Sequence, residues 1–149
     1  MIVVDTTVWI DFLEARGTPY HLHLRELVRE KAPLALTDLI YCEVLQGIVE
    51  DLTFRRTRDI LRAYPILHGR GVDTFEHAAQ IFRACRRKGF TVRNTVDCLI
   101  AATCLESGAE LFQNDRDFEA IAKVRGLQLY RPPKLRGGPT DQGKLPYQR

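Results

Sequence analysis

The sequence lacks a long hydrophobic run, and this absence excludes a helix that could span a membrane. No apolar stretch in the 149 residues approaches the roughly 18 residues that such a helix needs. The first residues also lack the basic stretch and the small-residue cleavage site of a secretory signal, because Asp5 and Asp11 interrupt them. We therefore expect a protein of the cytoplasm.

Cysteine is also sparse, and its four positions show no C-x-x-C spacing. The absence of C-x-x-C spacing argues against a zinc site, and the scatter of the cysteines through helical segments argues against a disulfide framework. We expect reduced thiols that pack as small hydrophobic side chains. The four residues are Cys42, Cys85, Cys98 and Cys104.

Net charge is small, at +3, but the basic residues are unevenly distributed. A local excess of positive charge fits a polyanionic partner such as RNA, although a solvated helix face gives the same pattern. One cluster comprises Arg55, Arg56, Arg58 and Arg62, and the other comprises Arg83, Arg86, Arg87, Lys88 and Arg93.

Short apolar segments alternate with longer segments of helical periodicity along most of the chain. This alternation predicts an α/β fold, with a parallel sheet of five strands and about seven helices on its two faces. The expected strands lie near residues 2–4, 34–37, 65–68, 110–113 and 126–130. The expected helices lie near residues 6–17, 20–31, 39–50, 52–63, 73–88, 94–107 and 116–123.

The length and the 45% content of hydrophobic residues allow one domain with a substantial core. We expect this domain to cover residues 1–132. From residue 133 to residue 149, prolines, glycines and scattered charges leave too little apolar material to pack. We expect these last residues to form a mobile basic tail.

The first expected strand, 2–4, delivers Asp5 to its carboxyl end. In open α/β sheets the functional crevice lies outside the carboxyl ends of the strands, near the point where strand order reverses, so Asp5 is well placed for chemistry. Two structural alternatives stay open. Asp5 itself could serve only as a helix cap, or Thr6 or Thr7 could cap the helix that follows.

Two further carboxylates lie inside expected helices. Glu43 is too deep in its helix for an N-terminal cap, but a solvent-exposed glutamate is an ordinary alternative. Asp97 lies on the apolar stripe, since Ile100 and Ala101 follow it at i+3 and i+4. Its alternative is a capping box, because Asp97 sits three residues after the possible cap Asn94.

Asp115 and Asp117 follow the fourth expected strand, where either one could cap the next helix. If this strand lies beside the first, Asp5 and Asp115 flank the same crevice. Clustered carboxylates repel one another unless a cation neutralises them, and hard oxygen ligands select Mg²⁺ or Mn²⁺ over zinc. The five acidic residues together therefore predict a metal site.

Four segments resemble, in order and spacing, those of PIN-domain ribonucleases of the VapC toxin type. They are Val4–Ile10, Cys42–Leu45, Thr95–Ala102 and Asp115–Phe118. The resemblance runs from Met1 to about Pro132. It implies a PIN-like α/β/α sandwich with a five-stranded parallel sheet, and a Mg²⁺- or Mn²⁺-dependent endoribonuclease that cuts RNA, forms a homodimer and is restrained by a VapB-type antitoxin.

The resemblance also assigns roles to individual residues. Asp117 becomes a further acidic member of the site, and Thr7 a small polar residue that helps to order it. Gln113 departs from the pattern, because many relatives have Thr or Ser there. Metal-site roles are implied for Asp5, Glu43, Asp97 and Asp115. Arg86, Arg87 and Arg93 are expected to bind RNA phosphates.

The resulting hypothesis is an endoribonuclease in which metal-activated water attacks a phosphodiester in line. A receiver-like signalling domain is the first rival, since it also gathers carboxylates around Mg²⁺. It would need a phosphoacceptor aspartate after the third strand, where the sequence reads Leu67-His68-Gly69. A catalytically silent module that binds RNA or protein is the second rival.

Overall fold

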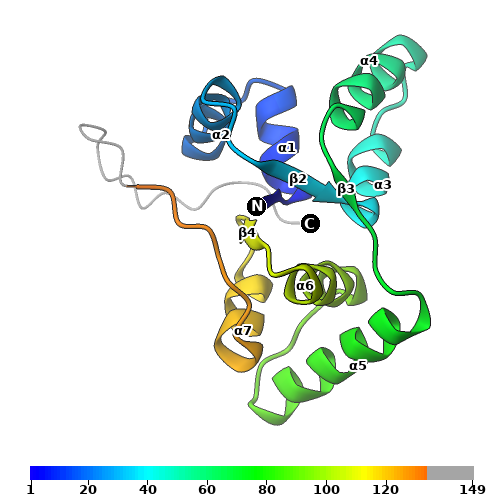
Figure 1. Cartoon of the computed structure of the whole chain (residues 1–149), viewed down its shortest axis with the longest axis vertical. Coiled ribbons are helices and arrows are strands. Elements are labelled where there is room, and N and C mark those ends of the chain that lie inside the picture. Colours follow the sequence, from blue (N-terminus) through cyan, green and yellow to red (C-terminus); the bar gives the residue numbers. More distant parts are fainter. Residues whose placement is uncertain (134–149) are drawn as a thin grey trace.

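Four parallel strands form the centre of the structure in the order β3-β2-β1-β4 (Figure 1). They are β1 (Ile2–Val4), β2 (Leu34–Thr37), β3 (Ile66–Leu67) and β4 (Glu110–Phe112). The computed structural model describes residues 1–133. Because β1 pairs with β2 on one side and with β4 on the other, strand order reverses at β1. The carboxyl ends of β1 and β4 are therefore neighbours.

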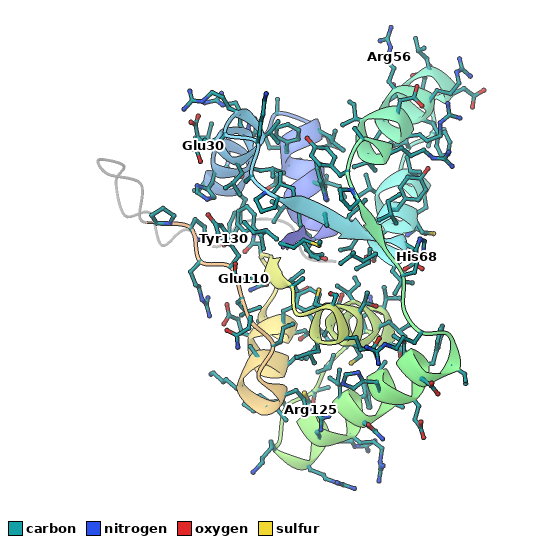
Figure 2. All side chains as sticks on the ribbon, viewed as in Figure 1. Glu30, Arg56, His68, Glu110, Arg125 and Tyr130 are labelled. Carbon is teal, nitrogen blue, oxygen red and sulfur yellow. The ribbon has the colours of Figure 1, made fainter. Side chains whose placement is uncertain are left out.

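The prediction of a fifth strand is wrong. Leu129 makes only an isolated parallel bridge to Leu111, through two main-chain hydrogen bonds of 2.9 Å that involve Gln128 and Tyr130. Figure 2 shows Tyr130 beside Glu110 at the start of β4. The pairing does not grow into a strand because Pro132 and Pro133 follow at once and have no N–H to donate.

Seven helices cover the sheet among the described residues, in agreement with the expected number. Figure 1 shows α1 to α4 on one side of the sheet and α5 to α7 on the other. They are α1 (Thr6–Leu13), α2 (Pro19–Arg29), α3 (Asp38–Gln46), α4 (Asp51–Arg62), α5 (Val72–Arg87), α6 (Thr95–Ser107) and α7 (Arg116–Arg125). None of the helices in this part of the chain is long and apolar enough to cross a bilayer.

Helix α6 is largely buried and carries one of the predicted site residues. Its residues from Asp97 to Cys104 are all buried, and the helix packs against β4, α5 and α7. Gly108 ends it in the left-handed conformation, with a φ of 67° that glycine adopts without a steric penalty. The hydrophobic core thus fixes the position of the first turn of α6.

All four cysteines are free, but Cys42 is exposed, so the prediction that it packs as a small hydrophobic side chain is wrong. Three of them are buried, and burial raises the pKa of Cys98 and of Cys104 to about 12. The mobile tail predicted for residues 133–149 lies outside the described residues from residue 134 onward.

Candidate metal centre

Three carboxylates from two helices converge at one end of the fold. Asp97 lies in the first turn of α6, Asp115 is the N-cap of α7, and Asp117 lies in the first turn of α7. One oxygen of each lies within 4.8 Å of the others. The three side chains line a pocket together with Arg93 and Asn94. This group of Asp97, Asp115 and Asp117 is called the acidic cluster below.

Local helix capping explains how the chain builds the acidic cluster. The Asn94 side chain accepts from the Val96 N–H at 2.9 Å, which starts α6 one turn before Asp97. The Asp115 Oδ1 accepts from the Asp117 N–H at 2.9 Å and starts α7. The N-termini of both helices favour negative charge. The capping role expected for Asp115 is confirmed, and its carboxylate still has lone pairs to offer a cation.

Asp5 is fully buried at the junction of β1 and α1. Its N–H donates to the Phe112 carbonyl at 2.9 Å, which places it beside the end of β4 as the reversal of strand order predicted. Asp5 occupies the N-cap position of α1, but its side chain makes no cap hydrogen bond. Thr6 and Thr7 are inside α1, so their predicted capping role is wrong.

The two threonines after Asp5 bind carboxylates instead. The Thr7 hydroxyl donates to the Asp5 Oδ2 at 3.4 Å, and the Thr6 hydroxyl donates to the Glu43 Oε1 at 2.8 Å. Glu43 is therefore half-buried and attached to α1 rather than freely solvated. Asp5 and Glu43 are thus each tied to a threonine of α1, whereas Asp97, Asp115 and Asp117 form the acidic cluster.

The sequence did not predict a site role for Asn94, which lines the pocket, or for Thr6. The contact of Thr6 with Glu43 joins residues 37 positions apart, which local spacing cannot reveal. The available signal was that Thr6, like Thr7, places a hydroxyl close behind the strand-end carboxylate of Asp5.

Arg93 contacts the acidic cluster directly. Its Nε donates to the Asp117 Oδ2 at 3.2 Å, and its Nη2 donates to the Asp115 Oδ1 at 3.2 Å. The pKa of Arg93 is raised, first by the hydrogen bond that its guanidinium donates to Asp117 and then by the negative charges of Asp117 and Asp115. Arg86 and Arg87, in contrast, are exposed in the last turn of α5 and do not line the pocket.

Gln113 joins the acidic cluster to the C-terminal end of the described chain. Its Oε1 accepts from the Asp115 N–H, and its Nε2 donates to the Glu119 Oε1 at 3.2 Å. Glu119 in turn accepts two hydrogen bonds from Arg131, at 2.7 and 2.8 Å. These bonds hold the loop that presents Asp115.

The donor set fits a hard divalent cation. Three carboxylates at close range offer oxygen ligands only, which is the preference of magnesium-like ions rather than of zinc. Asp97 and Asp117 are 1% and 4% exposed, so their mutual repulsion is poorly screened by water. The acidic cluster is therefore consistent with metal binding.

Comparison with known proteins agrees with this geometry. A family model described as PIN domain matches residues 2–124. VapC ribonuclease Mb1587 of Mycobacterium bovis and ribonuclease VapC11 of Mycobacterium tuberculosis are each 36% identical over 129 residues, which is 86% of this chain and 96% of the relative. The solved structure of VapBC2 from Rickettsia felis, bound to a promoter DNA fragment, covers 87% of this chain and 98% of its own, with a TM-score of 0.68. Its sequence identity of 20% supports the fold alone. The resembling segments and the acidic cluster all lie within the matched residues, and the chain belongs to the PIN-domain family.

Proposed function

We propose that this protein is a metal-dependent endoribonuclease that hydrolyses RNA phosphodiesters and acts as the toxin of a toxin–antitoxin pair. The observation that carries the proposal is the acidic cluster at the N-termini of α6 and α7. It occurs in a chain that is 36% identical to proteins named as VapC ribonucleases. The activity therefore rests on both the relatives and the site.

The proposed cofactor is Mg²⁺ or Mn²⁺. Asp97, Asp115 and Asp117 would hold the ion, with Asp5 and Glu43 as further carboxylates. When bound, such an ion stabilises charge on phosphoryl oxygens and lowers the pKa of a coordinated water. The carboxylates contribute the negative charge and the fixed positions that this chemistry needs.

The remaining polar residues orient the carboxylates and the substrate. Thr6 holds Glu43 and Thr7 contacts Asp5, so these two carboxylates are fixed by α1. Arg93 at the pocket, with Arg86 and Arg87 on α5, would contact RNA phosphates by electrostatic attraction. Phosphate contacts place the RNA without reading its bases.

The proposed regulator is a small VapB-type antitoxin, which would dock an amphipathic segment beside the N-terminal helices and block the pocket. The solved relative from Rickettsia felis carries the name VapBC2, and this supports such a partner. We further propose that the protein forms a homodimer and acts in the cytoplasm, where its RNA substrate is found.

The rival functions are less well supported. Strand β3 ends at Leu67 and His68 follows, so the phosphoacceptor aspartate of a receiver domain is missing at that place. A catalytically silent module that binds RNA without cleaving it is distinguished by the cleavage test described next.

The test is cleavage of structured RNAs by the purified protein, with Mg²⁺ or Mn²⁺ and with excess chelator. We expect cleavage with metal, loss of cleavage with chelator and recovery when metal is restored. Undiminished cleavage in excess chelator contradicts the metal mechanism. Binding of RNA without cleavage under every metal condition favours the silent module.

A further inference from the structure

Arg93 lies where a cation would bind. Its guanidinium spans two members of the acidic cluster, with one nitrogen on Asp117 and another on Asp115, each at 3.2 Å. Those same carboxylates, with Asp97, offer the oxygens that lie within 4.8 Å of one another. The protein thus supplies its own positive charge to the site that the proposed function gives to a metal.

The guanidinium and a divalent metal cannot share these oxygens without cost. Arginine stays protonated at any physiological pH, so the competition cannot be removed by deprotonation. When a metal binds, Arg93 must either give up its two contacts or remain beside a second positive charge. Both outcomes oppose metal binding.

The surroundings of Arg93 allow its side chain to leave while the carboxylates stay. The Arg93 side chain is 43% exposed, whereas those of Asp115 and Asp117 are 9% and 6% exposed. The main chain is held separately, because the Arg93 N–H also donates to the Asp117 Oδ2 and the adjacent Val92 is buried. Only the guanidinium needs to move.

We propose that Arg93 is a built-in counter-ion of the acidic cluster, which the metal displaces and which then binds an RNA phosphate. Metal loading would in this way release a phosphate-binding group at the edge of the pocket. The inference rests on the proposed function and goes beyond it, because it assigns Arg93 two successive partners.

A different role for Arg93 predicts the opposite change in metal affinity when the guanidinium is removed. If the guanidinium is a clamp that holds Asp115 and Asp117 in the positions needed for metal binding, its removal weakens metal affinity, as the loss of an outer partner usually does. If it is a competing counter-ion, its removal strengthens metal affinity. The sign of one binding measurement therefore separates the two roles.

The experiment is a calorimetric titration of Mn²⁺ into metal-free protein without RNA. Arg93→Gln keeps the main-chain bond to Asp117 and removes only the guanidinium. Two partly exposed ion pairs of modest strength are lost, so we expect Mn²⁺ to bind about threefold to tenfold more tightly. Arg125→Gln is the charge-matched control, since Figure 2 shows Arg125 at the far end of α7, and its Mn²⁺ affinity should equal that of the wild type.

A second variant and a second measurement guard against misfolding. Arg93→Lys keeps the charge but cannot span both carboxylates, so its Mn²⁺ affinity should fall between those of the wild type and Arg93→Gln. The metal-free melting temperature of Arg93→Gln should fall, because its carboxylates lose a counter-ion, and its Mn²⁺-induced rise should exceed that of the wild type. Unchanged or weaker Mn²⁺ binding in both variants overturns the proposal.

Cleavage kinetics test the second partner. At saturating Mn²⁺, Arg93→Gln should show a raised KM for RNA, while the Mn²⁺ concentration for half-maximal rate falls. An unchanged KM overturns the transfer of Arg93 to phosphate. A wild-type protein that neither binds Mn²⁺ nor cleaves RNA contradicts the proposed function itself, whereas an active wild type with no tightening in Arg93→Gln contradicts only this inference.

Discussion

Several residues of the acidic cluster serve the fold and the proposed chemistry at the same time. Asp115 starts α7 through the Asp117 N–H and lines the pocket with the same carboxyl group. Asp97 occupies the first turn of α6, where the helix dipole favours a negative charge. A structural role therefore does not exclude a place in the metal site, and variants must be chosen to separate the two.

Asp97→Asn separates the structural role of Asp97 from a role in the metal site, because the two roles predict opposite changes in stability. Neutralising one of three close carboxylates relieves repulsion, so the metal-free melting temperature should hold or rise. Mn²⁺ should then stabilise the variant less than the wild type, and RNA cleavage should be undetectable. The measurement is thermal unfolding with and without Mn²⁺, beside a cleavage assay.

The helix-dipole role alone predicts another pattern for Asp97→Asn. The variant would lose roughly 0.3–1 kcal/mol of stability and keep the full Mn²⁺ response. A less stable variant with normal cleavage would remove Asp97 from the site.

Thr6→Val tests the contact that fixes Glu43. Valine keeps the shape of threonine but removes the donor at 2.8 Å, so Glu43 loses its link to α1. We expect a reduction of about tenfold in cleavage rate, which is the lower end of the loss seen when a residue that hydrogen-bonds to a metal ligand is removed. Thr7→Val is the matched comparison, and its effect should be smaller because the Thr7 hydroxyl lies 3.4 Å from Asp5. Equal rates in both variants and the wild type would contradict a role for Glu43.

At the scale of helices and strands, local signals predicted much of the fold. Helices α3 and α6 lie close to their expected ranges, and each is bounded by a residue type typical of that position: Thr37 caps α3 and Gly108 ends α6. The start of α5 was predicted less well. The helix begins at Val72 rather than near residue 73, with Gly71 as its N-cap, and the Thr74 hydroxyl accepts from the Arg70 N–H and donates to Glu106. A hydroxyl has both local and distant partners, and the sequence does not say which it takes.

The sequence named five candidate acidic residues but did not show how they group in space. The sequence predicted Asp5 beside the end of β4 only on the condition that the two strands are neighbours, and the pairing of β1 with β4 meets this condition. The contacts that tie Glu43 to Thr6 and bring Asp97 to Asp115 and Asp117 join residues far apart in the chain, which local spacing does not reveal. The contacts of Arg93 were also not predicted. Arg93 was expected to bind RNA phosphates, and in the structure its guanidinium donates hydrogen bonds to Asp115 and Asp117.

The loop between β4 and α7 depends on Gln113, whose side chain accepts from the Asp115 N–H and donates to Glu119. Gln113→Met removes the acceptor of the Asp115 N–H and the donor to Glu119. We expect about tenfold weaker Mn²⁺ binding, because Asp115 is no longer held in place. Gln113→Thr restores a short acceptor and should recover most of the affinity. Titration calorimetry would measure both, and equal weakening in both would contradict this role of Gln113.

Helix α2 and the segment after α7 meet at a buried histidine. His23 stacks on Tyr130 with ring centroids 5.6 Å apart and shares a hydrogen bond of 2.8 Å with its hydroxyl. Burial lowers the pKa of His23, although the charges of Glu30 and Glu26 oppose this shift. The unfolded chain therefore takes up a proton, near the ordinary histidine pKa of about 6.5, at a higher pH than the folded protein does.

The sign of this shift predicts how stability depends on pH. The contribution of His23 is fully present above about pH 6.5 and is lost as the pH falls from there toward the lower folded pKa. Denaturant unfolding between pH 7.5 and 5.5 should show a steeper loss of stability for the wild type than for His23→Gln. Parallel pH profiles of the two proteins would contradict a lowered pKa at His23.

At the scale of the whole molecule, the acidic pocket and the basic surface are supplied by different elements. The reversal of strand order at β1 places Asp5 beside the end of β4, the strand from which the chain continues to Asp115. Arg86 and Arg87 are exposed in the last turn of α5, the helix that precedes Arg93 in the chain. Figure 2 shows Arg56 on α4, at the opposite end of the molecule from α5 and α7.

This arrangement predicts which basic cluster contacts RNA. Each lost phosphate contact reduces the slope of log affinity against log salt by about 0.7 for single-stranded RNA, because fewer counterions are released. The double substitution Arg86→Gln and Arg87→Gln should therefore reduce the slope by about 1.4. The matched double substitution Arg55→Gln and Arg56→Gln, on α4, should leave the slope unchanged. Fluorescence polarisation at several salt concentrations, in the Asp97→Asn background to prevent cleavage, measures both, and the reverse result would place the RNA on the α4 side of the sheet.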